Sequence, residues 1–412
     1  MSLFQNDWRE IWKYGERGFR YTNLDLGHLI GSLKVAMRLL GWQSHFVEIS
    51  DEELDLLLGL NKNLANEIES EHPAYLILVI PSSEKIGSTV FEELGEDFFE
   101  KWRENEWRGT QNQLSESHTG WKLLKAVTSA CKRKACKKRQ ILFAGREGKV
   151  DDPLELSENL FPAVDLSKIR NTIRTRRSAT SMENIPIFLE QFLGIISSIV
   201  CTECSTYQQK CFPYDGLDFE LEISAFLIYV MRVEGISPGY YLLLNDRSLP
   251  EKLRSIYQQH DTHCFEKVEH GALNLPLYCV RKATLEEVEK ASHKVSCSQQ
   301  IAKASAFTIG MACMIDEGIL EEKGGHVYKE AHWLCGIAGQ ILYLESEMRG
   351  LQSSGMGCFL DKQGINDFLL QQTSLKTLYH FTIGHATKLS NYPPYDYGHE
   401  IYSLSSTEQQ DL

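Results

Sequence analysis

The stretch that decides the fold is residues 336–350, which read GIAGQILYLESEMRG. A glycine stands at each end, and apolar side chains recur between them every three or four positions, a spacing that buries one stripe of a helix. Residues 27–41, GHLIGSLKVAMRLLG, show the same spacing, the same length and the same bracketing glycines. An aromatic and basic segment precedes each stretch. The repetition favours an internal duplication, although core packing alone also explains a glycine-bounded amphipathic helix.

Further elements follow from periodicity and from helix-capping residues. Ser50 and Glu53 form a capping-box pair, which predicts a helix that begins there. The spacing of apolar residues predicts later helices over 187–199, 285–291 and 302–315. Apolar and β-branched runs predict strands over 74–80, 223–233, 240–244 and 375–383.

A charged segment separates the two repeats. It predicts four parts: a partial first half over 1–82, a helical connector over 83–165, a second half over 166–400 and a tail over 401–412. The connector holds a basic run made of Lys132, Arg133, Lys134, Lys137, Lys138 and Arg139. We interpret this run as a solvated helix face, with a docking patch as the alternative.

Composition excludes several classes of function. The chain has 412 residues and a net charge of -13, which repels phosphate backbones, so nucleic acid is not an expected partner. Eleven scattered cysteines fit free thiols in a reducing compartment, which predicts a cytoplasmic protein. The sequence has no signal-peptide pattern and no apolar stretch of membrane-spanning length, so no membrane partner is expected.

The order of several short motifs resembles the nitroreductase superfamily. Residues 14–28 and 39–42 are similar to the middle of tandem nitroreductase-like proteins, which are related to azoline-forming peptide dehydrogenases. Arg176-Arg177-Ser178 resembles the family's opening motif, and residues 336–350 resemble its central interface helix. Residues 355–359 resemble its flavin-contacting glycine turn, and residues 378–384 resemble its closing strand. Residues 112–115, His118 and Trp121 fit the tandem branch.

The resemblance implies a fold, a cofactor and a reaction. The fold would be α+β, a mixed, mostly antiparallel sheet wrapped by helices, in an intrachain pseudo-dimer with an incomplete first copy. FMN would bind at the interface of the two halves and transfer hydride through N5, with NAD(P)H as a candidate electron donor. The substrate would be a small molecule or a peptide, and self-association into a homo-oligomer stays open.

The same resemblance assigns candidate residues to the cofactor. Guanidinium and hydroxyl groups suit a phosphate dianion, and the residues assigned to it are Arg176, Arg177, Ser178 and Lys388. Glycines let the backbone approach a flat ring, and the residues assigned to it are Gly355, Met356 and Gly357. A basic turn, a ligand-free loop and a surface lysine are the alternative interpretations. Thr180 departs from the family, whose commonest opening motif has a further arginine there.

Cysteines and histidines offer a weaker alternative. Cys201 and Cys204 form a Cys-x-x-Cys pair and could build a zinc site with Cys211, His260, His263 and Cys264. We favour free thiols, because a second Cys-x-x-Cys pair is absent from the sequence. Cys297 and Cys358 have no base close by in the sequence, so a thiolate nucleophile is not indicated.

The two repeats differ in what precedes them. A long stretch of chain separates Arg176 from Gly336 in the second half, whereas Gly27 stands close to Met1, so the first half has no room for a phosphate motif of its own. A truncation or isoform, a native partial copy and a degenerate scaffold are three explanations. The first two predict an FMN-dependent oxidoreductase with a single site, and the third predicts a non-catalytic pseudoenzyme that acts as an interaction module.

Overall fold

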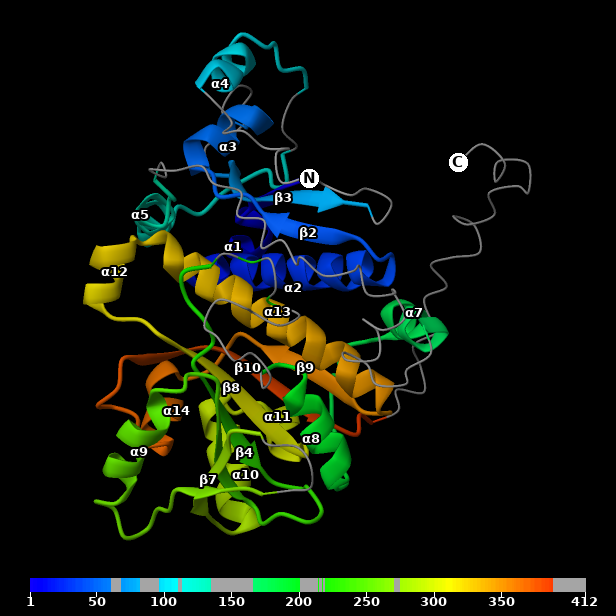
Figure 1. Cartoon of the computed structure of the whole chain (residues 1–412), viewed down its shortest axis with the longest axis vertical. Coiled ribbons are helices and arrows are strands. Elements are labelled where there is room, and N and C mark those ends of the chain that lie inside the picture. The colour runs from blue at the N-terminus through cyan, green and yellow to red at the C-terminus, as the bar shows by residue number, and fades with distance from the viewer. Residues whose placement is uncertain are drawn as a thin grey trace, which may run out of the picture.

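Two β-sheets flank a pair of long helices. The computed structural model describes residues 1–60, 68–81, 96–109, 113–134, 166–200, 214, 217, 219–269 and 275–387. The long helices α2 (Gly18–Leu39) and α13 (His326–Met348) cross between the sheets (Figure 1). The smaller sheet has the order β1-β3-β2, with β1 (Ser2–Asn6), β2 (Gln43–Phe46) and β3 (Glu71–Ile80).

The larger sheet has seven strands in the order β6-β7-β5-β4-β8-β10-β9, and every neighbouring pair runs antiparallel. Its strands are β4 (Ala225–Val230), β5 (Gly239–Leu244), β6 (Glu266–Lys267), β7 (Leu277–Lys282), β8 (Phe307–Met314), β9 (Gln352–Met356) and β10 (Leu375–Gly384). Both faces of β4 and β5 are buried, since every residue of the two strands is buried. Strands covered on both faces read as continuous apolar runs rather than as alternating ones.

The same six-element unit occurs twice. The N-terminal unit, residues 1–80, runs β1, α1, α2, β2, α3, β3, and the C-terminal unit, residues 307–384, runs β8, α12, α13, β9, α14, β10. In each unit the last strand lies in the middle and pairs antiparallel with the other two. The shorter helices are α1 (Trp8–Tyr14), the 3-10 helix η1 (Gly15–Arg17), α3 (Asp51–Leu58), α12 (Glu317–Lys323) and α14 (Asp361–Asp367). The predicted α+β pseudo-dimer with a shorter first copy is confirmed, because within the described residues the second sheet alone adds strands, β4 to β7, to the shared unit.

Helices cover both faces of the seven-stranded sheet. One face packs against α9 (Leu249–Tyr257), α10 (Leu285–Val295) and α14. The other face packs against α13 and α8 (Leu189–Ser197), and this core continues across α2 to the smaller sheet. A short helix, α11 (Gln300–Ala304), precedes β8. The units therefore share one hydrophobic core through their central helices, which places any site between them in rigid surroundings.

Glycines set the closeness of the central helices. A Cβ atom added to Gly27 would lie 2.3 Å from the backbone oxygen of Trp333, and one added to Gly336 would lie 2.2 Å from the backbone oxygen of Leu24. The indole Nε1 of Trp333 donates to Asn23 Oδ1 of the facing helix, at 2.8 Å. The repeated glycines thus serve backbone contact between α2 and α13, which no other residue type permits.

One predicted helix is wrong. Residues 302–315 do not form a helix: α11 ends at Ala304, and β8 occupies the centre of the larger sheet from Phe307 onward. Seven of the eight residues of β8 are buried, because strands lie on both sides of it and helices cover both faces. A short apolar run without alternation is compatible with a buried helix or a buried strand, and here the strand pairing decides.

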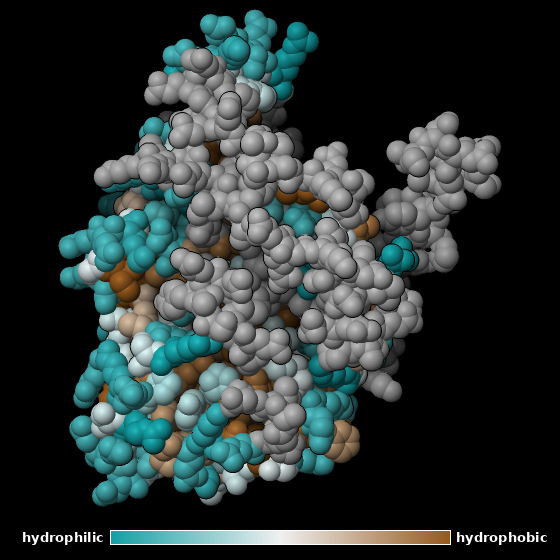
Figure 2. Space-filling model, in the orientation of Figure 1, coloured by the Kyte–Doolittle hydropathy of each residue, from teal (hydrophilic) through white to brown (hydrophobic). Residues whose placement is uncertain are grey.

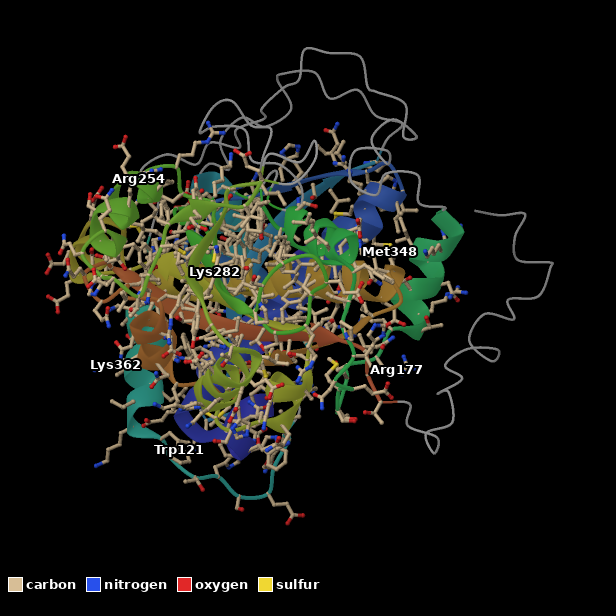
Figure 3. The ribbon with its side chains drawn as sticks, turned by 90° about the horizontal axis from the view of Figure 1, so that it is seen from below. Trp121, Arg177, Arg254, Lys282, Met348 and Lys362 are labelled. Atoms are coloured by element: carbon tan, nitrogen blue, oxygen red, sulfur yellow. The ribbon has the colours of Figure 1, made fainter. Side chains whose placement is uncertain are left out.

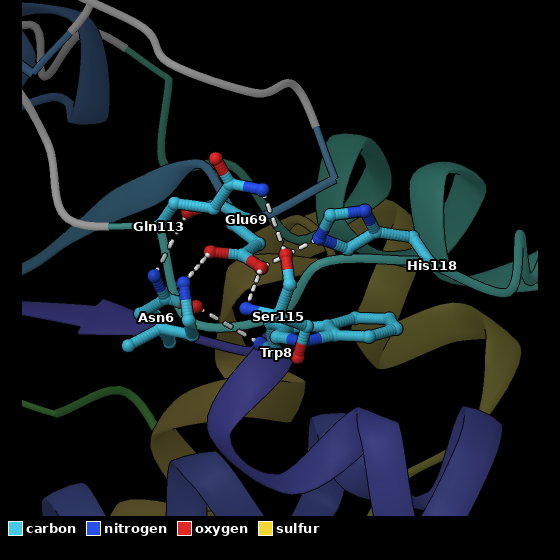
Figure 4. Close-up of polar contacts among 7 residues, drawn as sticks. Asn6, Trp8, Glu69, Gln113, Ser115 and His118 are labelled. Atoms are coloured by element: carbon cyan, nitrogen blue, oxygen red, sulfur yellow. Dashed lines mark hydrogen bonds and ion pairs between the residues drawn. The ribbon is translucent and has the colours of Figure 1, made fainter.

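Glu69 ties the connector to the N-terminal unit (Figure 4). Its buried carboxylate accepts from the backbone N–H groups of Leu114 and Ser115, at 2.5 and 2.8 Å, and contacts His118 Nε2 at 2.5 Å. Trp8 Nε1 donates to Ser115 Oγ at 2.7 Å and its ring packs against His118. Burial raises the pKa of Glu69, but these hydrogen bonds outweigh it and leave the pKa below its usual value. Leu114, Ser115 and His118 therefore fasten the connector to the N-terminal unit through Glu69, which is a structural role.

The described connector contains two helices, α4 (Glu96–Arg103) and α5 (Lys122–Ala130), and α7 (Leu166–Thr175) begins the second half. The basic run follows α5, and its described residues, 132–134, are not helical. Arg133 is buried and forms an ion pair with Glu330 of α13. The expectation of a solvated helix face is wrong for Arg133, since its guanidinium is buried and paired with a buried carboxylate of another element. Lys137, Lys138 and Arg139 lie outside the described residues.

Among the described residues, no helix combines the length and apolar character that a bilayer requires. Figure 2 shows hydrophilic residues over much of the described surface of one face, with apolar residues in small separate patches.

His380 predicts a pH dependence of stability. It is 1% exposed in β10, its ring nitrogens have no hydrogen-bond partner, and burial lowers its pKa to about 3. Because the pKa of His380 in the folded state lies below the unfolded value of about 6.5, protonation does not reduce the free energy of unfolding above about pH 6.5. Below that pH, the free energy of unfolding falls as the pH drops toward 3. His380→Phe, which keeps the stack on Phe359, should reduce this loss by up to about 1.4 kcal/mol per pH unit. Urea unfolding between pH 7 and 4 measures the loss in the unchanged chain and in the variant. The same dependence of the unfolding free energy on pH in both proteins would contradict this role of His380.

Candidate functional site

The predicted phosphate motif lies beside the predicted ring segment. Arg176, Arg177 and Ser178 follow directly on α7, and the amide of Arg176 continues the last turn by donating to Thr172 O at 2.9 Å. Ser178 forms a parallel bridge with Ser353 of β9. The motif is therefore held alongside the strand that contains Gly355, although the two segments lie far apart in the sequence.

Tyr343 of α13 joins the two segments. Its hydroxyl lies 2.9 Å from Ser178 Oγ and accepts from the backbone N–H of Gly355 at 3.0 Å. The guanidinium carbon of Arg176 lies 4.2 Å from the centre of the Tyr343 ring, a cation–π contact. One tyrosine thus contacts both groups of candidate residues. The sequence gives no local signal for it, because it lies on the central helix rather than in either motif.

The two arginines differ in how their charges are satisfied. Nη1 of Arg177 donates to the backbone carbonyls of residues 174–176, so this exposed side chain closes the end of α7. Nη1 of Arg176 is buried and has no hydrogen-bond partner. Burial raises the pKa of Glu347, and the charges of Arg176 and Arg177 oppose the rise. Arg176 is therefore the cation with spare donor capacity. In Figure 3, Arg177 and Met348 mark the end of the molecule where α7 and α13 meet.

The N-terminal unit contributes His28 from α2. His28 Nδ1 lies 3.1 Å from Gln340 Oε1, and His28 Nε2 lies 3.1 Å from the hydroxyl of Tyr379. Burial lowers the pKa of His28 to about 4, the hydrogen bond to Gln340 opposes this, and the charge of Arg176 lowers the pKa further. The imidazole is neutral at pH 7. Since Gln340 Oε1 only accepts, Nδ1 carries the proton and Nε2 accepts from Tyr379.

The predicted glycine turn is partly a strand. Gly355 and Met356 belong to β9 and pair with Phe381 and His380 of β10, and only Gly357 follows the strand. A Cβ added to Gly355 would lie 1.9 Å from the Tyr379 hydroxyl, and one added to Gly357 would lie 1.8 Å from Cε1 of Tyr21. Both glycines therefore serve close packing of tyrosines. The expectation of a turn is wrong for Gly355 and Met356, because pairing with β10 fixes their backbone as a strand.

These observations test whether the residues fit FMN. The phosphate end fits, because Arg176 has an unsatisfied donor beside Ser178 and Arg177. At the ring end, Tyr21 covers Gly357, so a flat ring reaches that backbone only where the Tyr21 side chain turns away. Lys388 lies outside the described residues.

The cysteine and histidine candidates are placed only in part. Cys201, Cys204 and Cys211 lie outside the described residues. Cys264 contacts Cys279, at 4.0 Å between the sulfur atoms, and the rings of His260 and His263 lie edge to face with 6.0 Å between their centres. Among the described residues, no group of three or more histidine, cysteine or carboxylate side chains has the arrangement of a metal site.

Comparison with known proteins gives the fold a name. No protein-family model and no curated protein matches the chain. A solved structure of a candidate nitroreductase from Anabaena variabilis superposes with a TM-score of 0.61 at 17% identity and covers 94% of this chain and 69% of its own. Nitroreductase A from Vibrio parahaemolyticus matches at a TM-score of 0.30 and 14% identity, covering 61% of this chain and 78% of its own. A chain of the Escherichia coli microcin synthetase complex, with a truncated peptide precursor bound, matches at a TM-score of 0.37 and 12% identity, covering 60% of this chain and 85% of its own. The chain therefore has a nitroreductase-like fold.

Proposed function

We propose that the chain binds FMN between its two units and acts as an oxidoreductase of the nitroreductase type. Arg176, Arg177 and Ser178 would hold the phosphate together with Lys388, and the segment of Gly355, Met356 and Gly357 would lie against the ring. The observation that carries the proposal is the buried Nη1 of Arg176, which has no partner within the described structure. A buried cationic donor without a partner costs free energy that a bound phosphate recovers.

When bound, FMN would supply hydride transfer at N5, between NAD(P)H and a small-molecule or peptide substrate. The protein's own residues would hold and orient. Tyr343 keeps Ser178 and the Gly355 amide in place through its hydroxyl. His28, neutral and bonded to Gln340, holds the hydroxyl proton of Tyr379 directed at its Nε2. The rings of Tyr343 and Tyr379 pack against the His28 ring, with 5.6 and 5.8 Å between the ring centres. The cytoplasm remains the proposed compartment, in keeping with seven free cysteines among the described residues.

Arg176→Ala should weaken FMN binding about 10-fold to 100-fold, the effect of losing a charge-assisted hydrogen bond. The measurement is the visible absorbance of the purified chain, followed by titration with FMN monitored by flavin fluorescence. Arg170→Ala is the matched control, because Arg170 is an exposed arginine of α7, outside the motif. Equal affinity in the Arg176→Ala variant and the unchanged protein would contradict the phosphate assignment.

A second candidate function is a non-catalytic interaction module. The packing of Tyr379 and Tyr21 on the two glycines favours it, because the backbone that would face the ring is already covered by the chain's own side chains. The module predicts a colourless protein that gains no flavin absorbance with excess FMN. It also predicts that the Tyr21→Ala variant gains no flavin absorbance with excess FMN. Under the flavin proposal, Tyr21→Ala uncovers Gly357 and binds FMN at least as tightly as the unchanged chain. Tyr14→Ala, which removes the exposed neighbouring ring, is the control.

A further inference from the structure

Two segments meet beside the candidate site and bring a pair of cysteines together. The backbone N–H of Leu360 donates to Val295 O at 2.8 Å, and the side chain of Gln299 donates to Cys358 O at 3.0 Å. Cys297 lies midway between Val295 and Gln299, so both contacts hold it opposite Cys358. Cys297 lies in the turn after α10 and Cys358 in the segment after β9, far apart in the sequence, which is why local spacing gave no sign of the pair.

An arginine from the other unit completes the group. Nη1 of Arg17, in η1, lies 3.1 Å from Cys358 Sγ, and its guanidinium also interacts with Cys297. The thiols of Cys297 and Cys358 interact with each other, and both are partly accessible to solvent. Burial raises the pKa of the Cys297 thiol and Cys358 raises it further; the charge of Arg17 opposes both effects without reversing them, so the pKa stays above its usual value. The guanidinium of Arg17 directly contacts the partly exposed Cys358 sulfur, where a positive charge can stabilise the negative sulfur that attacks a disulfide.

The backbone at Cys297 is strained. Cys297 has a φ of 53° and Ser298 a φ of 59°, two consecutive non-glycine residues in the left-handed region. Each such residue costs about 1 kcal/mol or more, and strain of this kind concentrates at functional sites. Glycine would remove the strain at either position, yet the chain has cysteine and serine there. The turn directs the thiol toward Cys358 and Arg17 instead of leaving it in the core.

We propose that Cys297 and Cys358 form a reversible dithiol–disulfide site that exchanges with small disulfides, with Arg17 as the positioning residue for the attacking thiolate. The Cys358 thiolate attacks one sulfur of the small disulfide, breaks its S–S bond and releases one thiolate. The Cys297 thiolate then attacks Cys358 Sγ, breaks the mixed disulfide and releases the second thiolate. The two cysteines lose two electrons and two protons, and the small disulfide, which is reduced to two thiols, gains them. The proposal does not depend on flavin.

The chain contains its own control pair. Cys264 and Cys279 lie 4.0 Å apart between sulfur atoms in the β6–β7 region, but Cys279 is 3% exposed. Burial, and then the neighbouring Cys264, raise the pKa of Cys279 to about 12. Proximity of two sulfurs is therefore common to both pairs, whereas accessibility and the adjacent arginine distinguish the first.

The test uses the full-length protein, reduced, freed of reductant and incubated with oxidised glutathione. Acid quenching, alkylation and peptide mapping without reduction identify the products. The expected product joins the peptides of Cys297 and Cys358, with two hydrogens lost, and forms at least about tenfold faster than any product of the Cys264–Cys279 pair. Absence of the joined peptide, or equal rates for the two pairs, would overturn the proposal.

Single variants test the assigned roles. Cys297→Ser should stop the reaction at a glutathione mixed disulfide on Cys358. A mixed disulfide on Cys297 in the Cys358→Ser variant, with none on Cys358 in the Cys297→Ser variant, would refute the order of attack. Arg17→Gln should slow the first step about threefold to tenfold and move its pH–rate profile to higher pH, whereas Arg17→Lys should retain most of the rate. An unchanged pH–rate profile in Arg17→Gln would leave Arg17 without the proposed role, since a purely structural contact moves no thiol pKa.

Discussion

Replacement of Gly336 by alanine is expected to destabilise the chain by about 2 to 3 kcal/mol. The added Cβ would lie 2.2 Å from Leu24 O and 2.7 Å from Gly27 Cα, so the atoms in its way belong to the backbone of α2. Backbone cannot rotate aside as a long side chain can, and the two helices must separate along a shared core. The gain in helix propensity from glycine to alanine, about 1 kcal/mol, offsets only part of this cost.

Thermal or urea unfolding followed by circular dichroism measures the Gly336→Ala effect. Gly120→Ala is the matched control, because no atom lies within 4 Å of its added Cβ and its φ is not positive. Its stability should stay within about 0.5 kcal/mol of the unchanged chain. A Gly336→Ala variant as stable as Gly120→Ala would mean that α2 and α13 do not meet at these glycines in solution.

The sequence predicted the central helices and the duplication, but not how the helices meet. Bracketing glycines and apolar stripes are local patterns, so they identified both helices. The contact between Gly27 and Gly336 depends on the arrangement of elements near opposite ends of the chain, and a single sequence carries no signal across that separation. The error at β8 has the same cause: Phe307 to Met314 is a strand because β4 and β10 pair with it, not because of its own spacing.

The candidate site shows the same division. The motif of Arg176 and Ser178 and the segment of Gly355 are placed together in the structure, as a shared cofactor role requires. Tyr343 and His28 escaped prediction, because each stands on a long helix where an aromatic residue is ordinarily read as core. Arg17 escaped because its contact with Cys358 crosses from one unit to the other. Sequence motifs therefore indicated the segments of the site, and packing between the units supplied its interior.

The duplication extends to a pair of ionic contacts. Arg20 of α2 contacts Asp361 at the start of α14, and Lys329 of α13 contacts Asp51 at the start of α3, at 2.6 and 2.7 Å. The two cations occupy equivalent places on the central helices, and the two carboxylates equivalent places on the helices that follow. Each central helix therefore reaches across to the helix that follows the other. The pairs differ in burial: the side chains of Arg20 and Asp361 are 33% and 46% exposed, those of Lys329 and Asp51 only 7% and 8%.

Lys329→Met is expected to destabilise the chain by about 3 to 5 kcal/mol, the cost of breaking a buried ion pair by removing one partner. Methionine keeps the aliphatic stem of Lys329 but removes its ammonium group, which leaves the Asp51 carboxylate buried without its cation. The loss should appear in urea unfolding at pH 7. Asp51→Asn added to Lys329→Met should regain much of the stability, because a neutral amide no longer requires the cation.

The symmetry-related pair supplies the control for Lys329→Met. Arg20→Met makes the same kind of change at the equivalent contact, but water reaches both Arg20 and Asp361, so its cost should stay within about 1 kcal/mol. The two ion pairs occupy equivalent places in the two units and differ in solvent access. The ratio of the two losses in unfolding free energy therefore reports how much more deeply the Lys329–Asp51 pair is buried than the Arg20–Asp361 pair. Equal losses would show that Asp51 is hydrated in solution. The N-terminal ends of α3 and α13 would then be less tightly closed than the structure has them.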